Sequence, residues 1–197
     1  AEQGPVLDRR KVRAGVVQGI QGIAWWRGRF GGEANHAGTT PLEYRRDALL
    51  AAAELCCGLR TFAEEMGNGA LTTMGRLRVS PDVVNVIPSE AAFTIDFRQV
   101  DEDLFERGKR AVEEMVRHVA GKHGLSFDLE QNTDTPPLRF APSMVALVER
   151  TVQELGLSNI PMPSGAGHDA KYMSRVCPTA MIFVPSIGGR SHCPDER

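Results

Sequence analysis

The sequence has 197 residues, of which 42% are apolar and 24% charged, and its formal net charge is −2. A chain of this length can bury a true hydrophobic core, and the composition is that of an ordinary globular protein. The near-neutral charge argues against electrostatic binding of nucleic acid, and no apolar run approaches the ~20 residues that cross a bilayer, so neither nucleic acid nor membrane is expected as a partner.

The cysteines and the first residues indicate a cytoplasmic protein. No basic segment followed by an apolar stretch is present, so no secretory signal is expected. The thiols form no paired C-x-x-C pattern, which argues against a thiolate zinc site. We therefore expect four reduced thiols, at Cys56, Cys57, Cys177 and Cys193.

The hydrophobic pattern predicts alternating strands and helices in the first two thirds of the chain. In chain order these are strands over 10–20 and 22–30, a helix over 41–66, strands over 70–79 and 91–97, a helix over 101–124 and a strand over 125–131. The last third is predicted to contain a proline-rich linker over 133–142, a helix over 143–155, a loop over 162–167 and a strand buried on both faces within 178–185.

The first helix carries a clear start signal. Thr40 can act as its N-cap, Pro41 suits its first position, and Glu43 completes a capping box. The charged residues that follow, Arg45, Arg46 and Asp47, are interpreted together with Glu43 as a solvated helix face.

The order of elements defines the domains. The strand–helix–strand–strand–helix–strand order within 22–132 is the split βαβ, ferredoxin-like order. The segments on either side belong together as parts of one α/β layer. We therefore predict a partial α/β domain over 1–20 and 134–197, with an inserted ferredoxin-like α+β domain over 21–133.

Three histidines lie in loops of small residues, where an imidazole can reach a ligand. His36 stands in E-A-N-H-A-G-T-T-P, and the alternative is a histidine that only bonds its own turn. His168 follows Ser-Gly-Ala-Gly, whose glycines permit close approach of a ligand or simply a flexible loop. His192 could bind a metal with Glu196 orienting it, although spacing alone favours a surface histidine.

Two polar residues near predicted strands are further candidates. Arg98 ends the run I-D-F-R and suits bidentate binding of a carboxylate, although pairing with Asp96 or Asp101 is the commoner arrangement. Asn85 interrupts the apolar run V-V-N-V-I-P, so a backbone partner or a ligand is expected if it is buried.

Taken together, four ordered motifs resemble one enzyme family over nearly the whole chain. The motifs read GGEANHAGTTPLEYRRDALLAAA, VNVIPSEAAFTIDFR, PSGAGHDA and MIFVPSIGGRSHCPDE. They resemble the zinc-dependent N-carbamoyl-L-amino-acid hydrolases, a group within the M20-type metallopeptidase superfamily that includes allantoate amidohydrolase. The resemblance implies a zinc-peptidase-like catalytic α/β domain with an inserted lid that also forms a homodimer. It implies two zinc ions, with Mn, Co or Ni as possible substitutes.

The resemblance also implies roles for single residues. His36 matches the lid histidine that reaches a neighbouring subunit's active site and helps polarise the scissile carbonyl. His192 matches the last zinc ligand, and Glu196 the acidic residue near it. The positions that match substrate-binding residues are Gln3, His36, Asn85, Arg98 and His168, of which Arg98 holds the substrate carboxylate.

The sequence departs from the family pattern at its beginning. The family motif there reads His-Ile-Glu-Gln-Gly-Pro, with a zinc-binding histidine, whereas this sequence opens Ala1-Glu2-Gln3-Gly4-Pro5. The family's other metal ligands and its general base also have no match. We therefore expect the chain as given to be an incomplete and inactive piece of an enzyme.

The function implied for the intact enzyme is hydrolysis of a carbamoyl C–N bond. An N-carbamoyl-L-amino acid would yield the amino acid, ammonia and carbon dioxide. Two alternatives stay open at this point. One is allantoate amidohydrolase, because Arg98 serves a carboxylate in either case, and the other is a catalytically dead dimerising module.

Overall fold

The computed structural model describes residues 4–190 and 194. The chain divides into two compact units, residues 22–136 and the flanking segments 1–21 and 137–197. We call these the inserted unit and the flanking unit. The divisions fall slightly later than those predicted from sequence, because the last strand of the inserted unit continues into the predicted linker and ends at Thr135.

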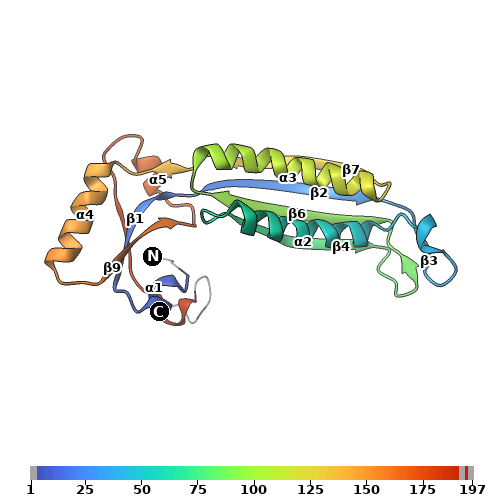
Figure 1. The fold of residues 1–197 in the computed structure, drawn as a ribbon, viewed down its shortest axis with the longest axis horizontal. Helices are drawn as coiled ribbons and strands as arrows, with labels where there is room; N and C mark the ends of the chain where they lie inside the picture. Colours follow the sequence, from blue (N-terminus) through green and yellow to red (C-terminus); the bar gives the residue numbers. More distant parts are fainter. Residues whose placement is uncertain (1–3, 191–193, 195–197) are drawn as a thin grey trace. The chain divides into compact units, whose positions relative to one another are not determined.

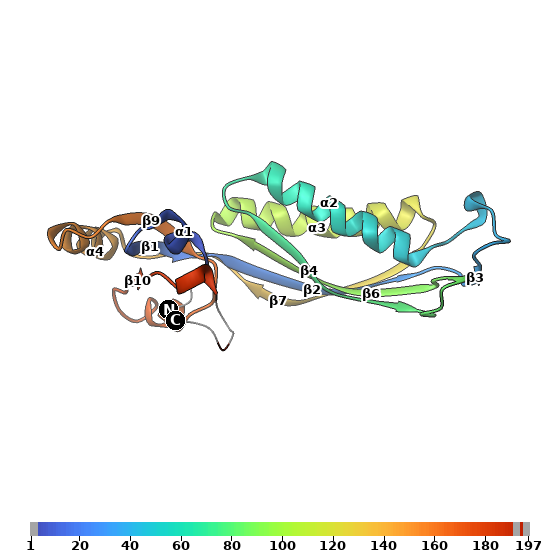
Figure 2. The same ribbon diagram turned by 90° about the horizontal axis from the view of Figure 1, so that it is seen from below.

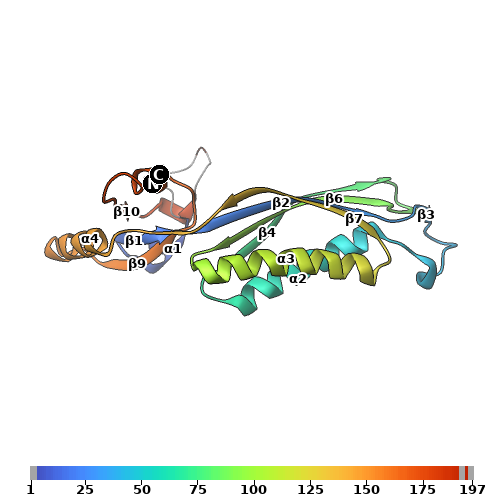
Figure 3. The ribbon, with the colours of Figure 1, turned by 90° about the horizontal axis from the view of Figure 1, so that it is seen from above.

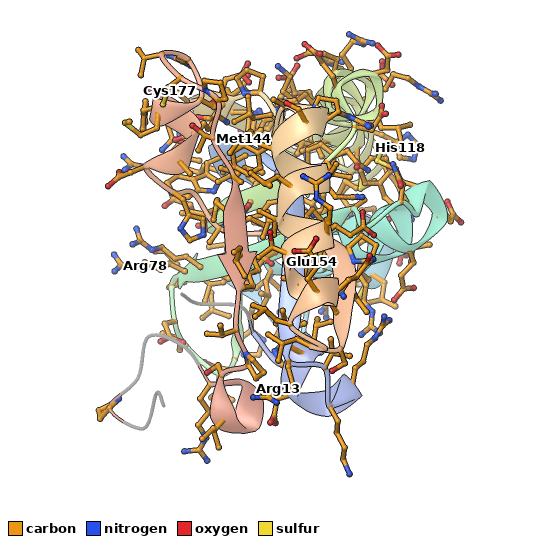
Figure 4. The ribbon with its side chains drawn as sticks, turned by 90° about the vertical axis from the view of Figure 1, so that its left-hand side faces the viewer. Arg13, Arg78, His118, Met144, Glu154 and Cys177 are labelled. Atoms are coloured by element: carbon orange, nitrogen blue, oxygen red, sulfur yellow. The ribbon has the colours of Figure 1, made fainter. Side chains whose placement is uncertain are left out.

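The flanking unit is a small mixed sheet with short helices. Its elements are α1 (Val6–Arg10), β1 (Ala14–Ile20), β8 (Leu138–Arg139), α4 (Pro142–Glu154), β9 (Asn159–Ser164), α5 (Ala170–Met173), β10 (Met181–Phe183) and the 3-10 turn η2 (Ile187–Gly189). Strand β1 pairs with β9 in parallel and with β8 and β10 antiparallel. Met144 and Glu154 mark the two ends of α4 (Figure 4). The core of this unit consists of Leu7, Val17, Ile20, Phe140 and Phe183.

Two expectations for this unit were wrong. Residues 162–164 belong to β9 and not to a loop. Prolines are tolerated there because β9 pairs only with β1 among the described residues, and an edge strand does not need every N–H donor. The run around β10 is not buried on both faces, since Ile182 is 52% exposed and β10 likewise pairs with β1 alone among the described residues.

The inserted unit contains the longer elements. These are β2 (Gly22–Gly31), β3 (Asn35–His36), the 3-10 turn η1 (Leu42–Tyr44), α2 (Ala48–Met66), β4 (Leu71–Ser80), β5 (Val86–Ile87), β6 (Glu90–Gln99), α3 (Glu102–Lys122) and β7 (Ser126–Thr135). The four long strands pair antiparallel in the order β4-β6-β2-β7, which is the order of a ferredoxin-like sheet. The mixed α/β class and the ferredoxin-like order of this unit are therefore confirmed.

Both long helices cover the same face of the four-stranded sheet (Figures 1 and 2). Alternate residues of β2 and β6 point into the layer between sheet and helices, so Trp26, Phe30, Phe93 and Phe97 are buried there. Trp25 points to the other face and is 41% exposed. The open face of the sheet therefore carries the odd-numbered residues of β2 and the even-numbered residues of β6.

The start of α2 differs from the prediction. The segment after Thr40 forms only the short turn η1, and Arg45 then adopts an extended backbone conformation. The helix begins at Ala48, and the Asp47 carboxylate is its N-cap, accepting from the N–H groups of Leu49 and Leu50 at 3.0 Å each. The capping signature at Thr40 therefore does not start the helix, and residues 40–46 form a loop with contacts of its own.

The short strands β3 and β5 pair antiparallel beyond the end of the four-stranded sheet (Figure 3). We call residues 35–45 together with 83–87 the arm. Large apolar side chains are exposed on it, among them Leu42, Tyr44, Val83 and Val84. The arm therefore presents a surface suited to contact with another molecule.

Candidate active site

The arm brings His36 and Asn85 together. Asn35 pairs with Ile87 and His36 with Val86, so β3 and β5 hold the two loops side by side. The N–H of Ala37 donates to the carbonyl of Asn85 at 2.9 Å. Asn85 was predicted within an apolar strand, but it lies in an exposed turn before β5, where its side chain is accessible.

The His36 ring is oriented by its own loop. The backbone N–H of Gly38 donates to His36 Nδ1 at 3.0 Å. Because that nitrogen accepts a hydrogen bond, the proton of the neutral imidazole resides on Nε2. His36 is exposed, so the arm offers a hydrogen-bond donor to a group that approaches it from outside.

Arg98 lies at the opposite end of the sheet, on its open face. It pairs with Ile23 of β2 and Leu71 of β4. Its guanidinium binds the Asp96 carboxylate with two donors, Nε to Oδ1 at 3.0 Å and Nη2 to Oδ2 at 2.7 Å. Both side chains are 27% exposed, so Asp96 fixes the plane of a guanidinium that solvent and ligands can still reach.

The structure does not bring Arg98 near His36. Arg98 is eight positions after Glu90 in β6, and eight steps of an extended strand span about 27 Å. His36 pairs with Val86, still further along. One small substrate therefore cannot contact both residues of the same inserted unit.

His168 lies in the flanking unit, in the loop before α5. Its ring packs against Phe183 at a centroid distance of 5.9 Å, and its Nε2 is buried with no hydrogen-bond partner among the described residues. A buried imidazole nitrogen without a partner is available to a ligand. Nearby Lys171 is only 7% exposed, and burial, reinforced by Arg175, lowers the pKa of its ammonium group.

Three predicted positions, Gln3, His192 and Glu196, lie outside the described residues. Within 4–190 and 194, no group of three His, Cys, Asp or Glu side chains is placed so that it could hold a metal ion. The described residues therefore do not fit a metal centre of their own. The other histidines are peripheral: His118 is exposed on α3 (Figure 4), and His123 contacts Glu54 at 2.9 Å.

Sequence reasoning missed two residues that shape the arm. Arg45 was assigned to a solvated helix face, but its guanidinium donates to the carbonyls of Ala37 and Thr40. Gly38 was not singled out, yet a Cβ atom there would lie 3.2 Å from the His36 ring. The H-A-G-T-T-P motif predicted the loop around His36. It did not predict the contacts of Arg45 and Gly38, because these form only when the loop is folded.

Comparison with known proteins identifies the family. Residues 2–197 match the family described as Peptidase family M20/M25/M40, and this chain belongs to it. Among the described residues, no helix is long and apolar enough to cross a membrane.

Similar proteins within this family carry the names of amidohydrolases and amidases. The N-carbamoyl-L-amino-acid amidohydrolase of Paenarthrobacter aurescens is 36% identical over 195 residues, which are 99% of this chain and 47% of that protein. The allantoate amidohydrolase of Escherichia coli (strain K12) is 36% identical over 196 residues, which are 100% of this chain and 48% of that protein. The crystal structure of a hydantoinase/carbamoylase-family amidase from Burkholderia multivorans superposes with a TM-score of 0.96 at 37% identity, covering 99% of this chain and 47% of that one. The chain thus spans about half the length of the curated relatives it matches.

Proposed function

We propose that this protein is an amidohydrolase that cleaves the carbamoyl C–N bond of N-carbamoyl-L-amino acids. One water is consumed, and the amino acid, ammonia and carbon dioxide are released. The observation that carries the proposal is the 36% identity to an enzyme of that name over 99% of the chain. Allantoate amidohydrolase is the second candidate, because a relative so named is equally similar.

In this proposal the exposed Nε2–H of His36 donates a hydrogen bond to the carbonyl oxygen of the carbamoyl group. Negative charge develops on that oxygen as water adds to the carbon, so the donor stabilises the transition state more than the substrate. The bond from Gly38 N–H to Nδ1 supports this role, because it keeps the donor proton on the outer nitrogen.

Arg98 is proposed to bind the α-carboxylate of the substrate. The contacts with Asp96 set the guanidinium plane in advance, which lowers the cost of ordering a long side chain when the ligand arrives. Fixing the carboxylate also fixes the position of the carbamoyl group relative to the catalytic residues.

The separation of Arg98 and the arm supports a site shared between two copies of the chain. His36 and Asn85 lie together on the arm, whereas Arg98 lies about 27 Å along β6 from Glu90, the residue at which the strand leaves the arm side of the sheet. We propose that the arm of one copy completes the site that contains Arg98 of another copy. Asn85 then acts beside His36 and not beside Arg98 of its own unit.

Zinc is the proposed metal of the intact enzyme. Members of this family are generally metal-dependent. His192 is proposed as a ligand of this metal, as the family resemblance of its motif implies. His168, whose buried Nε2 has no partner among the described residues, is proposed to contact the substrate. Metal analysis of the full-length protein, purified without added metal, tests the identity of the ion.

The decisive experiment is a substrate comparison with the full-length protein. Ammonia release from several N-carbamoyl-L-amino acids and from allantoate is measured, together with His36→Ala and, as a control, His118→Ala. We expect the carbamoyl substrates to have the higher kcat/KM and His36→Ala to lower it by about 10²- to 10³-fold, as for loss of an oxyanion donor. Faster hydrolysis of allantoate favours the second candidate, and no hydrolysis of either substrate contradicts the assignment.

A further inference from the structure

The strongest contacts in the arm that the proposed reaction does not use are those of Arg45. Its side chain is partly buried. Nε donates to the carbonyl of Thr40 at 3.0 Å, and Nη2 donates to the carbonyl of Ala37 at 2.6 Å. A charged donor makes hydrogen bonds that are stronger than those between neutral groups, and two of them on one rigid fork also fix a direction.

The carbonyl of Ala37 and the N–H of Gly38 belong to the same peptide group. That group is planar and trans, so its C=O and its N–H point in opposite directions. Arg45 binds the oxygen at one side, and His36 Nδ1 accepts from the N–H at the other. Rotation of this peptide would break both bonds and turn a carbonyl oxygen toward Nδ1.

We propose that Arg45 is a positioning residue that fixes the Ala37–Gly38 peptide group, so that its N–H holds His36 with the ring proton on Nε2. A charge-assisted bond to the carbonyl also polarises the peptide and strengthens its N–H as a donor. Arg45 thus determines which ring nitrogen of His36 can donate. The proposal rests on the proposed function only where it links this tautomer to catalysis.

The other hydrogen bonds that the structure describes in the arm do not hold the Ala37–Gly38 peptide group. The carbonyl of His36 accepts from the N–H and the hydroxyl of Thr40, at 3.2 and 2.8 Å, and these bonds close the turn without touching the Ala37–Gly38 peptide. The bond from Ala37 N–H to Asn85 holds the preceding peptide group. Among the described residues, Arg45 is the side chain with a hydrogen bond to the carbonyl of Ala37.

The neighbouring Arg46 provides a matched control. It has the same charge and lies in the same segment, but it is exposed, and its side chain makes no hydrogen bond or ion pair within the described part of the chain. Arg46→Ala therefore removes one positive charge next to the arm and leaves the two hydrogen bonds of Arg45 in place. Arg45→Lys keeps the charge, but a single ammonium cannot reproduce the two-pronged contact.

The first test is spectroscopic and does not depend on activity. The full-length protein is labelled with ¹⁵N in its histidine rings, and the His36 signals are assigned by their loss in His36→Ala. We expect the wild type and Arg46→Ala to show a single tautomer with the proton on Nε2. Arg45→Ala should show a mixture of both tautomers, and Arg45→Lys an intermediate mixture. An unchanged single tautomer in Arg45→Ala overturns the proposal.

The second test is a double-mutant cycle on hydrolysis of an N-carbamoyl-L-amino acid. Arg45→Ala should lower kcat by about 10- to 100-fold, as expected for a misplaced catalytic group, with little change in KM. Arg46→Ala should have an effect of less than about twofold. In the His36→Ala background, Arg45→Ala should cause no further loss, because both changes remove the same donor.

The outcomes separate the two proposals. A full additional loss in the double variant shows that Arg45 acts independently of His36 and overturns the positioning role. If His36→Ala itself leaves the rate unchanged, the catalytic role of His36 is wrong, and the tautomer measurement alone decides the role of Arg45. Folding of each variant is checked by its urea midpoint, and Arg45→Lys replaces Arg45→Ala if the latter is unfolded.

Discussion

At the scale of single residues, the backbone around His36 determines how this proposed catalytic side chain can act. Its ring is exposed, and the property that matters, the position of the proton, is set by the backbone N–H of Gly38. A glycine suits position 38 because a Cβ atom there would lie 3.2 Å from Cε1 and 3.5 Å from Nδ1 of His36. The backbone can approach the ring closely only when that atom is missing.

This contact gives a prediction for Gly38→Ala. The added methyl group must displace the His36 ring by a few tenths of an ångström, because the ring is the nearest neighbour it meets. We expect kcat for an N-carbamoyl-L-amino acid to fall by about 10-fold or more, while the urea midpoint stays close to wild type. Gly121→Ala is the control, since nothing lies within 4 Å of its added Cβ. Equal kinetics for both variants would mean that the ring tolerates the methyl group.

At the scale of elements, the two helices of the inserted unit are joined at one end by an ionic contact. Glu54 of α2 accepts from Lys122 at 2.6 Å and contacts His123 Nε2 at 2.9 Å, both at the end of α3. The hydrogen bond from Lys122, followed by that from His123, lowers the pKa of the Glu54 carboxyl below its ordinary value of 4.5. The Glu54 side chain is 35% exposed, so the stabilisation is modest.

A carboxyl group with a lowered pKa stabilises the folded state above its unfolded pKa and loses this effect as the pH falls toward its folded pKa. Glu54→Gln should therefore cost less than about 1 kcal/mol at neutral pH. The difference from wild type should shrink as the pH falls below 4.5. Urea unfolding between neutral and acidic pH measures it, with Glu65→Gln on the same helix as the control. A difference that is independent of pH would show that Glu54 stabilises by packing and not by charge.

At the scale of the whole molecule, the ten-residue strands of the inserted unit separate two parts of the proposed site. The arm carries His36 and Asn85, and the opposite end of β6 carries Arg98. A dimer with two-fold symmetry can form two complete sites, because the arm of each copy can reach the Arg98 region of the other copy.

Complementation tests this arrangement. His36→Ala and Arg98→Ala should each be nearly inactive alone. When the two full-length variants are co-expressed, about half of the dimers are hybrids with one intact site, so activity should return to about a quarter of wild type. Two His36→Ala forms with different tags serve as the control for mixing. If the hybrid stays inactive although both chains co-purify, His36 and Arg98 act in the same copy.

The sequence determined the elements whose signal is local. The alternation of residues 91–97 predicted a strand, and Asp101 predicted the start of a helix. Both elements are present, as β6 and α3, with ends that differ by a few residues, because backbone pairing and capping depend on neighbouring residues. The order of these elements also determined the ferredoxin-like topology of the inserted unit. The motifs around His36, Arg98 and His168 were sufficient to indicate the family.

Only the tertiary structure decided where those residues lie. Thr40 and Glu43 carry a capping signature, yet α2 begins at Ala48, since closing the arm with Arg45 requires an extended backbone there. Asn85 and Arg98 are 13 positions apart in sequence, but one lies on the arm and the other at the far end of β6. The ion pair of Arg98 with Asp96 and the hydrogen bond of Arg45 to Ala37 depend on distances between atoms. The hydrophobic periodicity of the sequence does not specify such distances. Local propensity fixes elements one at a time, whereas a site requires the simultaneous placement of several, and that is a property of the folded chain.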